Sequence, residues 1–432
     1  MKKNLEPKKV SSIFIHCIIA LMIAGLFSFS TGCDEGSFEV DLTEEDVLTE
    51  PESLTVFSWP SFDGFYPGYV TTSASSSYAN RCAREPETDI SSEISTDPGY
   101  IMAYRSGKSS CSVWAPTNEQ NELIHRQGIQ RFRRNGYNYL LVSGSVNSEY
   151  YAGFEVVKMA SRGNDLNGLG SGGVTPTSWP LCSDAIVEYA TYPYSSRRHA
   201  GGLQVNGRFV ALPLEDEDDS YTAAFRIYDL ADPENPVQGS TVFRQRGSSS
   251  EKKNAGAAAF TRLNNGKYMV MIFGNDSDEV EVFVTSGTTI STSASIWESK
   301  HQEDTPSGFE KYQNVQFITA CSDKPDKPYN GRLYVLGTHN QSGSKDWADL
   351  WRVTFSTDGN YNPSFSKVAN RNMTCRSSNT GNTRYCNFHA GAGAYVNYYG
   401  DVYIYGVEHY DDAYPNTGYG VKVREFTSPT NH

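Results

Sequence analysis

Asn206-Gly-Arg-Phe-Val-Ala-Leu-Pro-Leu214 joins an Asn-Gly pair to a strand-like run, and this stretch decides the fold. Asn-Gly is the strongest short signal for a β-hairpin, because both central residues of a type I′ turn need a positive φ. The pair recurs at Asn135-Gly136, Asn265-Gly266 and Asn330-Gly331, each time between two strand-like runs. This repetition predicts a chain built from β-hairpins.

Two further positions extend the repeat at its ends. Asp63-Gly64 and Tyr399-Gly400 stand where the Asn-Gly pair stands in the other units, and successive turn glycines are 59 to 72 residues apart. The six turn glycines are Gly64, Gly136, Gly207, Gly266, Gly331 and Gly400. Four strands per unit at such a spacing are typical of a propeller. We therefore predict an all-β fold, a six-bladed β-propeller of four-stranded antiparallel blades over residues 53–432.

A third strand is predicted in every unit, after the hairpin and a polar loop. In five units this strand alternates apolar and polar residues, which indicates a strand with one face covered. These runs are residues 154–158, 225–229, 280–284, 350–354 and 421–425. The first unit fits more loosely, with residues 100–105 as its third strand.

The last predicted blade stops at its third strand, because the chain ends soon after residue 425. Residues 38–42, with the sequence Phe-Glu-Val-Asp-Leu, are a candidate outer strand that would close the ring from the N-terminus. The alternative is that residues 33–52, which are acidic and poor in aromatic residues, form only a solvated tether.

One segment resembles a known repeat. Arg226-Ile-Tyr-Asp-Leu-Ala-Asp-Pro-Glu-Asn-Pro-Val237 is similar to the repeat of LVIVD-type β-propellers, in which a strand ends in a turn like Asp-Pro-x-x-Pro-Val. The likeness covers about a dozen residues in one blade. It implies a propeller in a secreted or surface setting, and it implies no reaction.

The N-terminus has the pattern of an export signal over residues 1–32. Four lysines precede a mostly apolar stretch, residues 11–29, and the segment ends in Ser30-Thr31-Gly32-Cys33. Small residues before a cysteine resemble the bacterial lipoprotein box, so we expect a lipid on Cys33 and a place in the cell envelope. An uncleaved membrane helix is the alternative, since the apolar stretch is nearly long enough to span a bilayer.

Charge and cysteine content narrow the partners further. The chain has a formal net charge of −13, and residues 1–32 contain four Lys and one Glu, so the remainder carries −16. Such a surface repels phosphate backbones, which argues against nucleic acid as a partner.

Six cysteines follow Cys33, and in an exported chain this even number suggests disulfides. Cys375 and Cys386 flank a short polar segment and are predicted to pair. The pairing of Cys82, Cys111, Cys182 and Cys321 stays open.

Histidines and carboxylates gather at one predicted face. In a propeller the inner strand of every blade starts near the axis and the second strand returns to the same face. Aligned on Gly201-Gly202, the entry positions are His125, His199, Asn254, Lys311 and His389. The returning ends carry Glu215, Asn275, His339, Glu408 and His409.

Two readings of this axial face follow. Imidazoles and carboxylates that converge can hold a divalent metal or act as general acid and base. The arrangement resembles that of propeller enzymes with axial histidines, such as some polysaccharide lyases and carotenoid-cleaving oxygenases. The alternative is that these side chains only bind water in a channel. We expect a lipid-anchored propeller that binds an extracellular carbohydrate or protein on this face. The competing hypothesis is a metal-assisted polysaccharide lyase or hydrolase.

Overall fold

In the computed structural model, the chain divides into two compact units, residues 1–53 and residues 54–432. The structure describes residues 67–68, 83–96, 100–104, 123–134, 137–146, 151–159, 185–193, 199–215, 223–244, 254–263, 265–290, 296–320, 332–341, 345–373, 388, 391–397, 400–407 and 421–427. The predicted signal, tether and lipidation site lie outside these residues. Among the described residues, no helix has the length and apolar character needed to cross a bilayer.

The second unit is a β-propeller whose described strands form four hydrogen-bonded sheets. The largest sheet has eight strands and consists of two antiparallel halves, which meet through a single parallel bridge between Ala392 and Gly128. One half consists of β3 (Leu123–Arg134), β4 (Tyr137–Val146), β5 (Tyr151–Lys158) and β6 (Ala185–Pro193). The other consists of β20 (Ala392–Val396), β21 (Val402–Val407), β22 (Val421–Phe426) and β2 (Tyr100–Tyr104).

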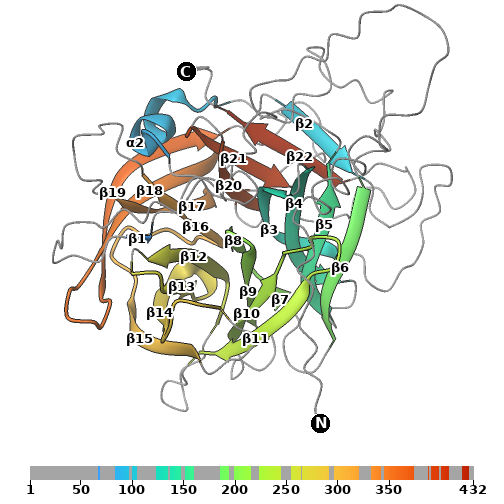
Figure 1. Cartoon of the computed structure of the whole chain (residues 1–432). Coiled ribbons are helices and arrows are strands. Elements are labelled where there is room, and N and C mark those ends of the chain that lie inside the picture. Colours follow the sequence, from blue (N-terminus) through green and yellow to red (C-terminus); the bar gives the residue numbers. More distant parts are fainter. Residues whose placement is uncertain are drawn as a thin grey trace, which may run out of the picture. The chain divides into compact units, whose positions relative to one another are not determined.

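The other three sheets follow one another along the chain between these halves. The first contains β7 (His199–Ala200), β8 (Gln204–Asn206), β9 (Phe209–Glu215), β10 (Ala224–Asp229) and β11 (Val237–Phe243). The next contains β12 (Ala257–Leu263), β13 (Tyr268–Phe273), β14 (Glu279–Thr285) and β15 (Trp297–Asp304), with β1 (Pro67–Gly68) beside β12. The last contains β16 (Asn314–Thr319), β17 (Leu333–Gln341), β18 (Lys345–Phe355) and β19 (Pro363–Met373). Figure 1 shows β3, β8, β12, β16 and β20 at the centre of this arrangement.

The prediction of six blades is wrong, because the described strands form four sheets, two of five strands, one of four and one of eight. Residues 100–104 were expected in the third strand of a separate first blade. Instead β2 pairs with β22 and supplies the outer strand of the last unit, from Tyr100 opposite Glu425 to Tyr104 opposite Val421. Residues 38–42, the candidate outer strand for this edge, lie outside the described residues. The repeat pattern assigns β2 to a first blade of its own, and this assignment raises the predicted number of blades.

The hairpins and third strands are confirmed where the structure describes them. Asn206 pairs with Phe209 around Gly207, which has a φ of +59°, and Gly266 and Gly400 also have positive φ values. Both faces of β13 are buried. In β13, Met269 and Met271 pack toward the β16–β19 sheet, whereas Val270 and Ile272 pack toward the β7–β11 sheet. Alternate side chains therefore enter two different cores, as expected when sheets stack face to face around an axis.

Three short helical turns occur in the described residues. The first two, α2 (Pro86–Thr88) and the π-helical turn Asp89–Glu93, follow each other and pack on β19. The third is a 3₁₀ turn, Asn275–Ser277, between β13 and β14. There Asp276 and Ser277 both have positive φ values, which are uncommon for residues other than glycine.

Candidate active site at the axial face

The inner strands approach one another closely where they start. Gly202 bridges Ala257, and Ala392 bridges Gly128, in parallel pairs between neighbouring units. A Cβ atom on Gly128 would lie 2.8 Å from the Cα of Gly202, and one on Gly201 would meet the carbonyl of Gly256. Glycine is required here because the backbones leave no room for a side chain. The bridged residues stand three positions after the predicted entry residues, including His125, His199 and Asn254.

The structure brings His125, His199 and Glu215 together. The two imidazole rings have their centroids 5.1 Å apart and are inclined by 44°. Residue His199 in β7 pairs with Glu215 in β9, and its Nδ1 lies 2.7 Å from the Oε1 of Glu215. Gln127 joins the group, with its Nε2 2.6 Å from the Nε2 of His125. These four residues are called the axial site below.

Hydrogen bonding and burial set the charge states in the axial site. The side chains of Gln127 and His125 share a hydrogen bond, with their Nε2 atoms 2.6 Å apart. Burial, with a contribution from His199, lowers the pKa of His125 to about 3, so the ring is neutral at physiological pH. The carboxylate of Glu215 favours a proton on the Nδ1 of His199.

Glu215 is ionised although it is buried. Burial acts to raise its pKa, but the contact with His199, the amide of Ala255 and the charge of Arg244 outweigh burial, so the pKa of Glu215 is lowered. The Ala255 amide donates to the Oε2 of Glu215 over 3.0 Å. Both carboxylate oxygens of Glu215 therefore have partners.

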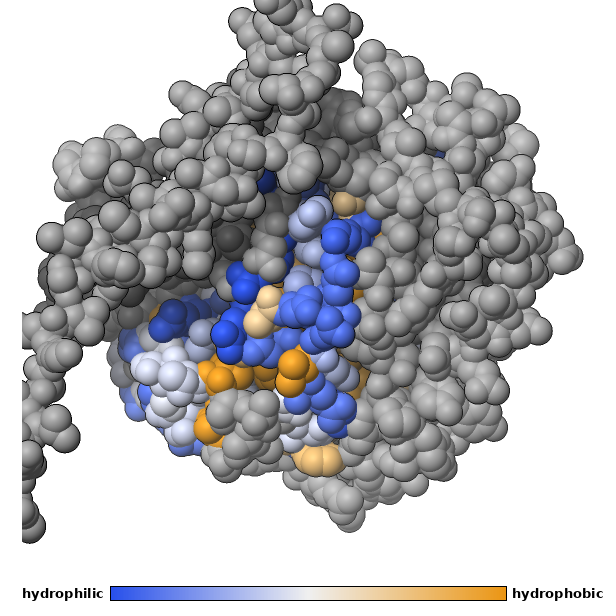
Figure 2. All heavy atoms as spheres, turned by 45° about the vertical axis from the view of Figure 1, so that its right-hand side comes forward, coloured by the Kyte–Doolittle hydropathy of each residue, from blue (hydrophilic) through white to orange (hydrophobic). Residues whose placement is uncertain are grey.

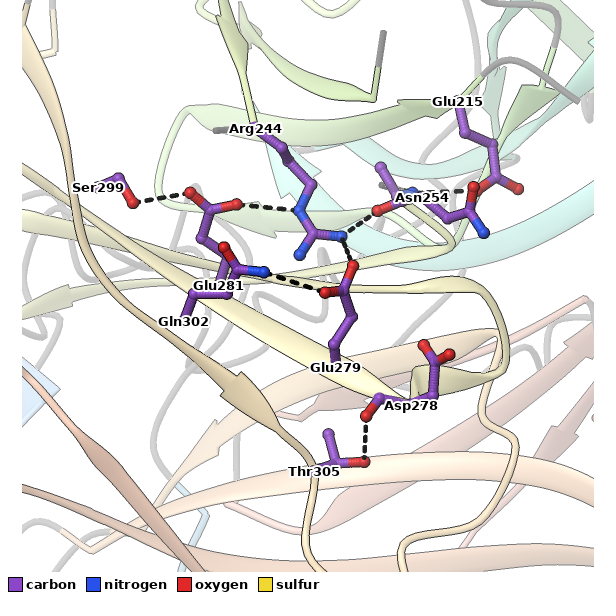
Figure 3. A network of polar contacts seen from close by, with 10 residues as sticks. Glu215, Arg244, Asn254, Asp278, Glu279, Glu281, Ser299, Gln302 and Thr305 are labelled. Atoms are coloured by element: carbon purple, nitrogen blue, oxygen red, sulfur yellow. Dashed lines mark hydrogen bonds and ion pairs between the residues drawn. The ribbon is translucent and has the colours of Figure 1, made fainter. Parts of the chain in front are cut away.

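A network of buried charges lies behind Glu215 (Figure 3). Arg244 directly follows β11, and its guanidinium lies 2.9 Å from Glu279 and 3.0 Å from Glu281. The Nη1 of Arg244 also donates to the backbone carbonyl of Asn254. Asn254 thus takes part through its backbone.

The remaining predicted site residues are placed elsewhere. His339 lies in a second buried cluster, with its Nε2 3.2 Å from the Oδ2 of Asp349. The same oxygen accepts from the hydroxyl of Tyr312 over 2.6 Å and lies 2.8 Å from the Nζ of Lys367. Lys311 is exposed and pairs with Asp276 at 2.8 Å. His389, Glu408 and His409 lie outside the described residues, as do Cys375 and Cys386.

A metal site is not formed by the described part of the chain. No group of three or more His, Cys, Asp or Glu side chains that could hold a metal ion occurs among these residues. The axial site offers acid–base and hydrogen-bonding chemistry: a neutral imidazole, a second imidazole oriented by a carboxylate, and an amide.

Two residues of the site and its support were not predicted. Gln127 stands two residues after His125, and the search for histidines and carboxylates does not include glutamine. Its spacing could have identified it, because residues two apart in a strand lie on the same face. Arg244 carries no such signal, because it is a single arginine after an outer strand.

No family model matches the chain, and no curated protein matches it. Among solved structures, the chain is similar to a family 117 glycoside hydrolase from the marine bacterium Zobellia galactanivorans, with a TM-score of 0.35, 10% identity, and coverage of 78% of this chain and 91% of that one. It is also similar to a DUF4623 family protein from Bacteroides eggerthii, with a TM-score of 0.33, 10% identity, and coverage of 78% and 77%. A third similar structure is a GH43_1 enzyme from Xanthomonas citri, with a TM-score of 0.32, 8% identity, and coverage of 70% and 87%. At these TM-scores the likenesses assign neither a family nor an activity to the chain.

Proposed function

We propose that this β-propeller binds an extracellular carbohydrate at the axial site, while a lipid on Cys33 holds it at a bacterial membrane. One observation carries the binding proposal: His125, Gln127, His199 and Glu215 converge where the inner strands start. The export pattern that ends in Ser30-Thr31-Gly32-Cys33 supports the location.

The chemistry of these groups suits sugar hydroxyls, each of which donates one hydrogen bond and accepts others. The axial site supplies an imidazole that stays neutral, a carboxylate and an amide, so it contains both donors and acceptors. His125 is only partly buried, whereas the side chains of Gln127, His199 and Glu215 are almost fully buried. A ligand would therefore contact His125 first.

The surface also favours a polar ligand. In Figure 2 the described residues on the face shown are mainly hydrophilic, with a smaller hydrophobic group among them. Among the described residues, the large hydrophobic side chains that are exposed are Tyr137, Val237 and Phe243. A broad apolar patch of the kind that marks many protein interfaces is not formed by these three residues.

The test is binding of the full-length protein, in detergent, to a panel of soluble polysaccharides, measured by calorimetry. We expect His125→Ala and His199→Ala each to weaken binding at least about tenfold, the loss of one to two hydrogen bonds, in protein that circular dichroism shows to be folded. His301→Ala is the matched control, since His301 lies on the outer strand β15 beside Glu303. Equal binding by all three variants, or binding of a protein partner with no polysaccharide bound, would contradict the proposal.

Hydrolysis or elimination at the same site is the second candidate. The His199–Glu215 contact favours it, because a carboxylate that orients an imidazole is the arrangement of a general base. Product release from the same polysaccharide panel decides between the two functions: turnover that His199→Ala and Glu215→Gln abolish indicates an enzyme, and binding without turnover indicates a receptor.

The anchor has its own test. Cys33→Ser removes the thiol that a lipid would modify. We therefore expect the variant to take up no fatty-acid label in cells, and to occur as precursor or soluble protein in place of the mature membrane-bound form. The result would favour an uncleaved helix if the wild type takes up no fatty-acid label and the Cys33→Ser variant associates with the membrane to the same extent as the wild type.

A further inference from the structure

We infer that Arg244 is a positioning residue for the axial site, acting through the peptide unit between Asn254 and Ala255 on Glu215 and, through Glu215, on His199. The inference deepens the proposed function, because it assigns a supporting residue to the same site.

Arg244 is held in a fixed position. Its side chain is completely buried, with Nε 3.0 Å from the Oε2 of Glu281 and Nη1 2.9 Å from the Oε1 of Glu279. Each glutamate is fixed in turn, because Ser299 donates to Glu281 over 2.7 Å and Gln302 donates to Glu279 over 3.1 Å. Buried ion pairs of this kind lose much of their attraction to desolvation, so stability alone gives little reason for the cluster.

The connection to the axial site passes through one peptide plane. The Nη1 of Arg244 donates to the carbonyl oxygen of Asn254, and the N–H of Ala255 donates to the Oε2 of Glu215 over 3.0 Å. This C=O and this N–H belong to the same rigid, planar peptide unit. An arginine that fixes and polarises the carbonyl therefore fixes the direction of the N–H and strengthens its hydrogen bond to the carboxylate.

The far end of the connection is the histidine. The other oxygen of Glu215 lies 2.7 Å from the Nδ1 of His199, whose ring stands beside that of His125. Figure 3 shows Arg244 between the two glutamates on one side and Asn254 and Glu215 on the other. The positive charge of Arg244 also helps to lower the pKa of Glu215, after the larger effects of burial, His199 and Ala255.

The experiment reads the site without any ligand. In full-length protein labelled with ¹⁵N-alanine, the amide resonance of Ala255, assigned through Ala255→Gly, follows the titration of Glu215. We expect Arg244→Lys to shift this resonance and to raise the pH midpoint that it reports, because an ammonium cannot hold both glutamates and the carbonyl at once. The double variant Arg244→Met with Glu281→Gln removes the positive charge and also neutralises one of its two glutamate partners. It should raise the midpoint further.

Arg226→Lys is the matched control. Arg226 is also buried, lies in β10 of the sheet that contains Glu215, and donates from Nε to Thr241 over 2.8 Å. This variant should leave the Ala255 resonance and its midpoint at the wild-type values. An unchanged Ala255 titration in either Arg244 variant with a native melting curve would overturn the inference. Absence of carbohydrate binding by the wild type would instead refute the proposed function and leave the titration result standing.

Discussion

Asp89 has a buried carboxyl group that does not belong to the axial site. It is 3% exposed, and its Oδ2 accepts from the amide of Val402 over 3.0 Å. Burial raises the pKa of Asp89 from 3.8 to about 7, and the nearby charges of Asp401 and Glu93 add to this effect against the Val402 hydrogen bond. The folded protein therefore binds a proton at Asp89 more tightly than the unfolded chain does.

The sign of the resulting pH dependence follows from linkage. Because the folded pKa lies above the unfolded value, Asp89 costs nothing below about pH 4 and reduces stability progressively as the pH rises to about 7. We expect Asp89→Asn, which can keep the acceptor for Val402, to stabilise the protein by up to about 4 kcal/mol at pH 8 and by little at pH 4. Urea unfolding of both proteins between pH 4 and 8 measures the difference.

The exposed Asp304 at the end of β15 provides the control for this prediction. Asp304→Asn should leave the pH dependence of unfolding unchanged. A constant difference between Asp89→Asn and wild type across the pH range would show that the carboxyl does not titrate in the expected window.

Strand β2 and the residues just before it connect the beginning of the propeller to its end. Ala83 bridges Ala320 at the end of β16, and Ile90 and Ile94 are fully buried between the last two units. Arg371 in β19 donates to the carbonyls of Ser91, Ser92 and Ile94. Residues 83–104 thus join an early part of the chain to its last described strand, and β2 forms the edge of the sheet beyond β22.

Two truncations test this closure. Removing residues 1–53 leaves the closing segment intact and should preserve the melting temperature. Removing residues 1–105 deletes β2 and exposes the apolar surface that Ile90 and Ile94 cover, so we expect a fall of at least about 5 °C or loss of folding. A marked loss of stability in the shorter truncation, measured by calorimetry, would instead assign a structural role to residues 1–53.

The propeller as a whole is held together at its axis by glutamines. Gln204 in β8 accepts from the amides of Phe260, over 2.7 Å, and Phe317, over 2.8 Å, and its Nε2 donates to the carbonyl of Phe317. Gln316 donates to the carbonyl of Leu203 over 3.0 Å and accepts from Ala394, while Gln130 accepts from Val205. Because these bonds run between strands that are far apart in the sequence, they fix the inner strands β3, β8, β12, β16 and β20 relative to one another.

Gln204→Leu is the corresponding test. The variant keeps the volume but leaves two buried N–H groups and a carbonyl without their partner, so we expect a loss of about 2–5 kcal/mol in unfolding free energy. Gln302→Leu on the outer strand β15 is the control and should change stability by less than about 1 kcal/mol. Denaturant unfolding measures both, and equal effects would show that the axial hydrogen bonds carry no special weight.

Local features of the chain were predictable from the sequence. The turns at Gly207, Gly266 and Gly400 depend on backbone φ, and the third strands depend on a two-residue period, so both are set by residues close together in the chain. The alignment that placed His125 and His199 at equivalent positions uses the same repeat. Their meeting with Glu215 follows because equivalent strand ends converge on one axis.

Features that depend on distant partners were not predictable in this way. Residues 100–104 have the same strand pattern whether they form a blade of their own or close the last one, and only pairing with β22, more than 300 residues away, distinguishes the two cases. Likewise, nothing near Arg244 in sequence indicates that its guanidinium meets Glu279 and Glu281 and reaches the axial site through Asn254. Backbone turns and strand periods arise from neighbouring residues, whereas edge pairing and buried charge contacts arise from the packing of the complete propeller, which tertiary structure alone decides.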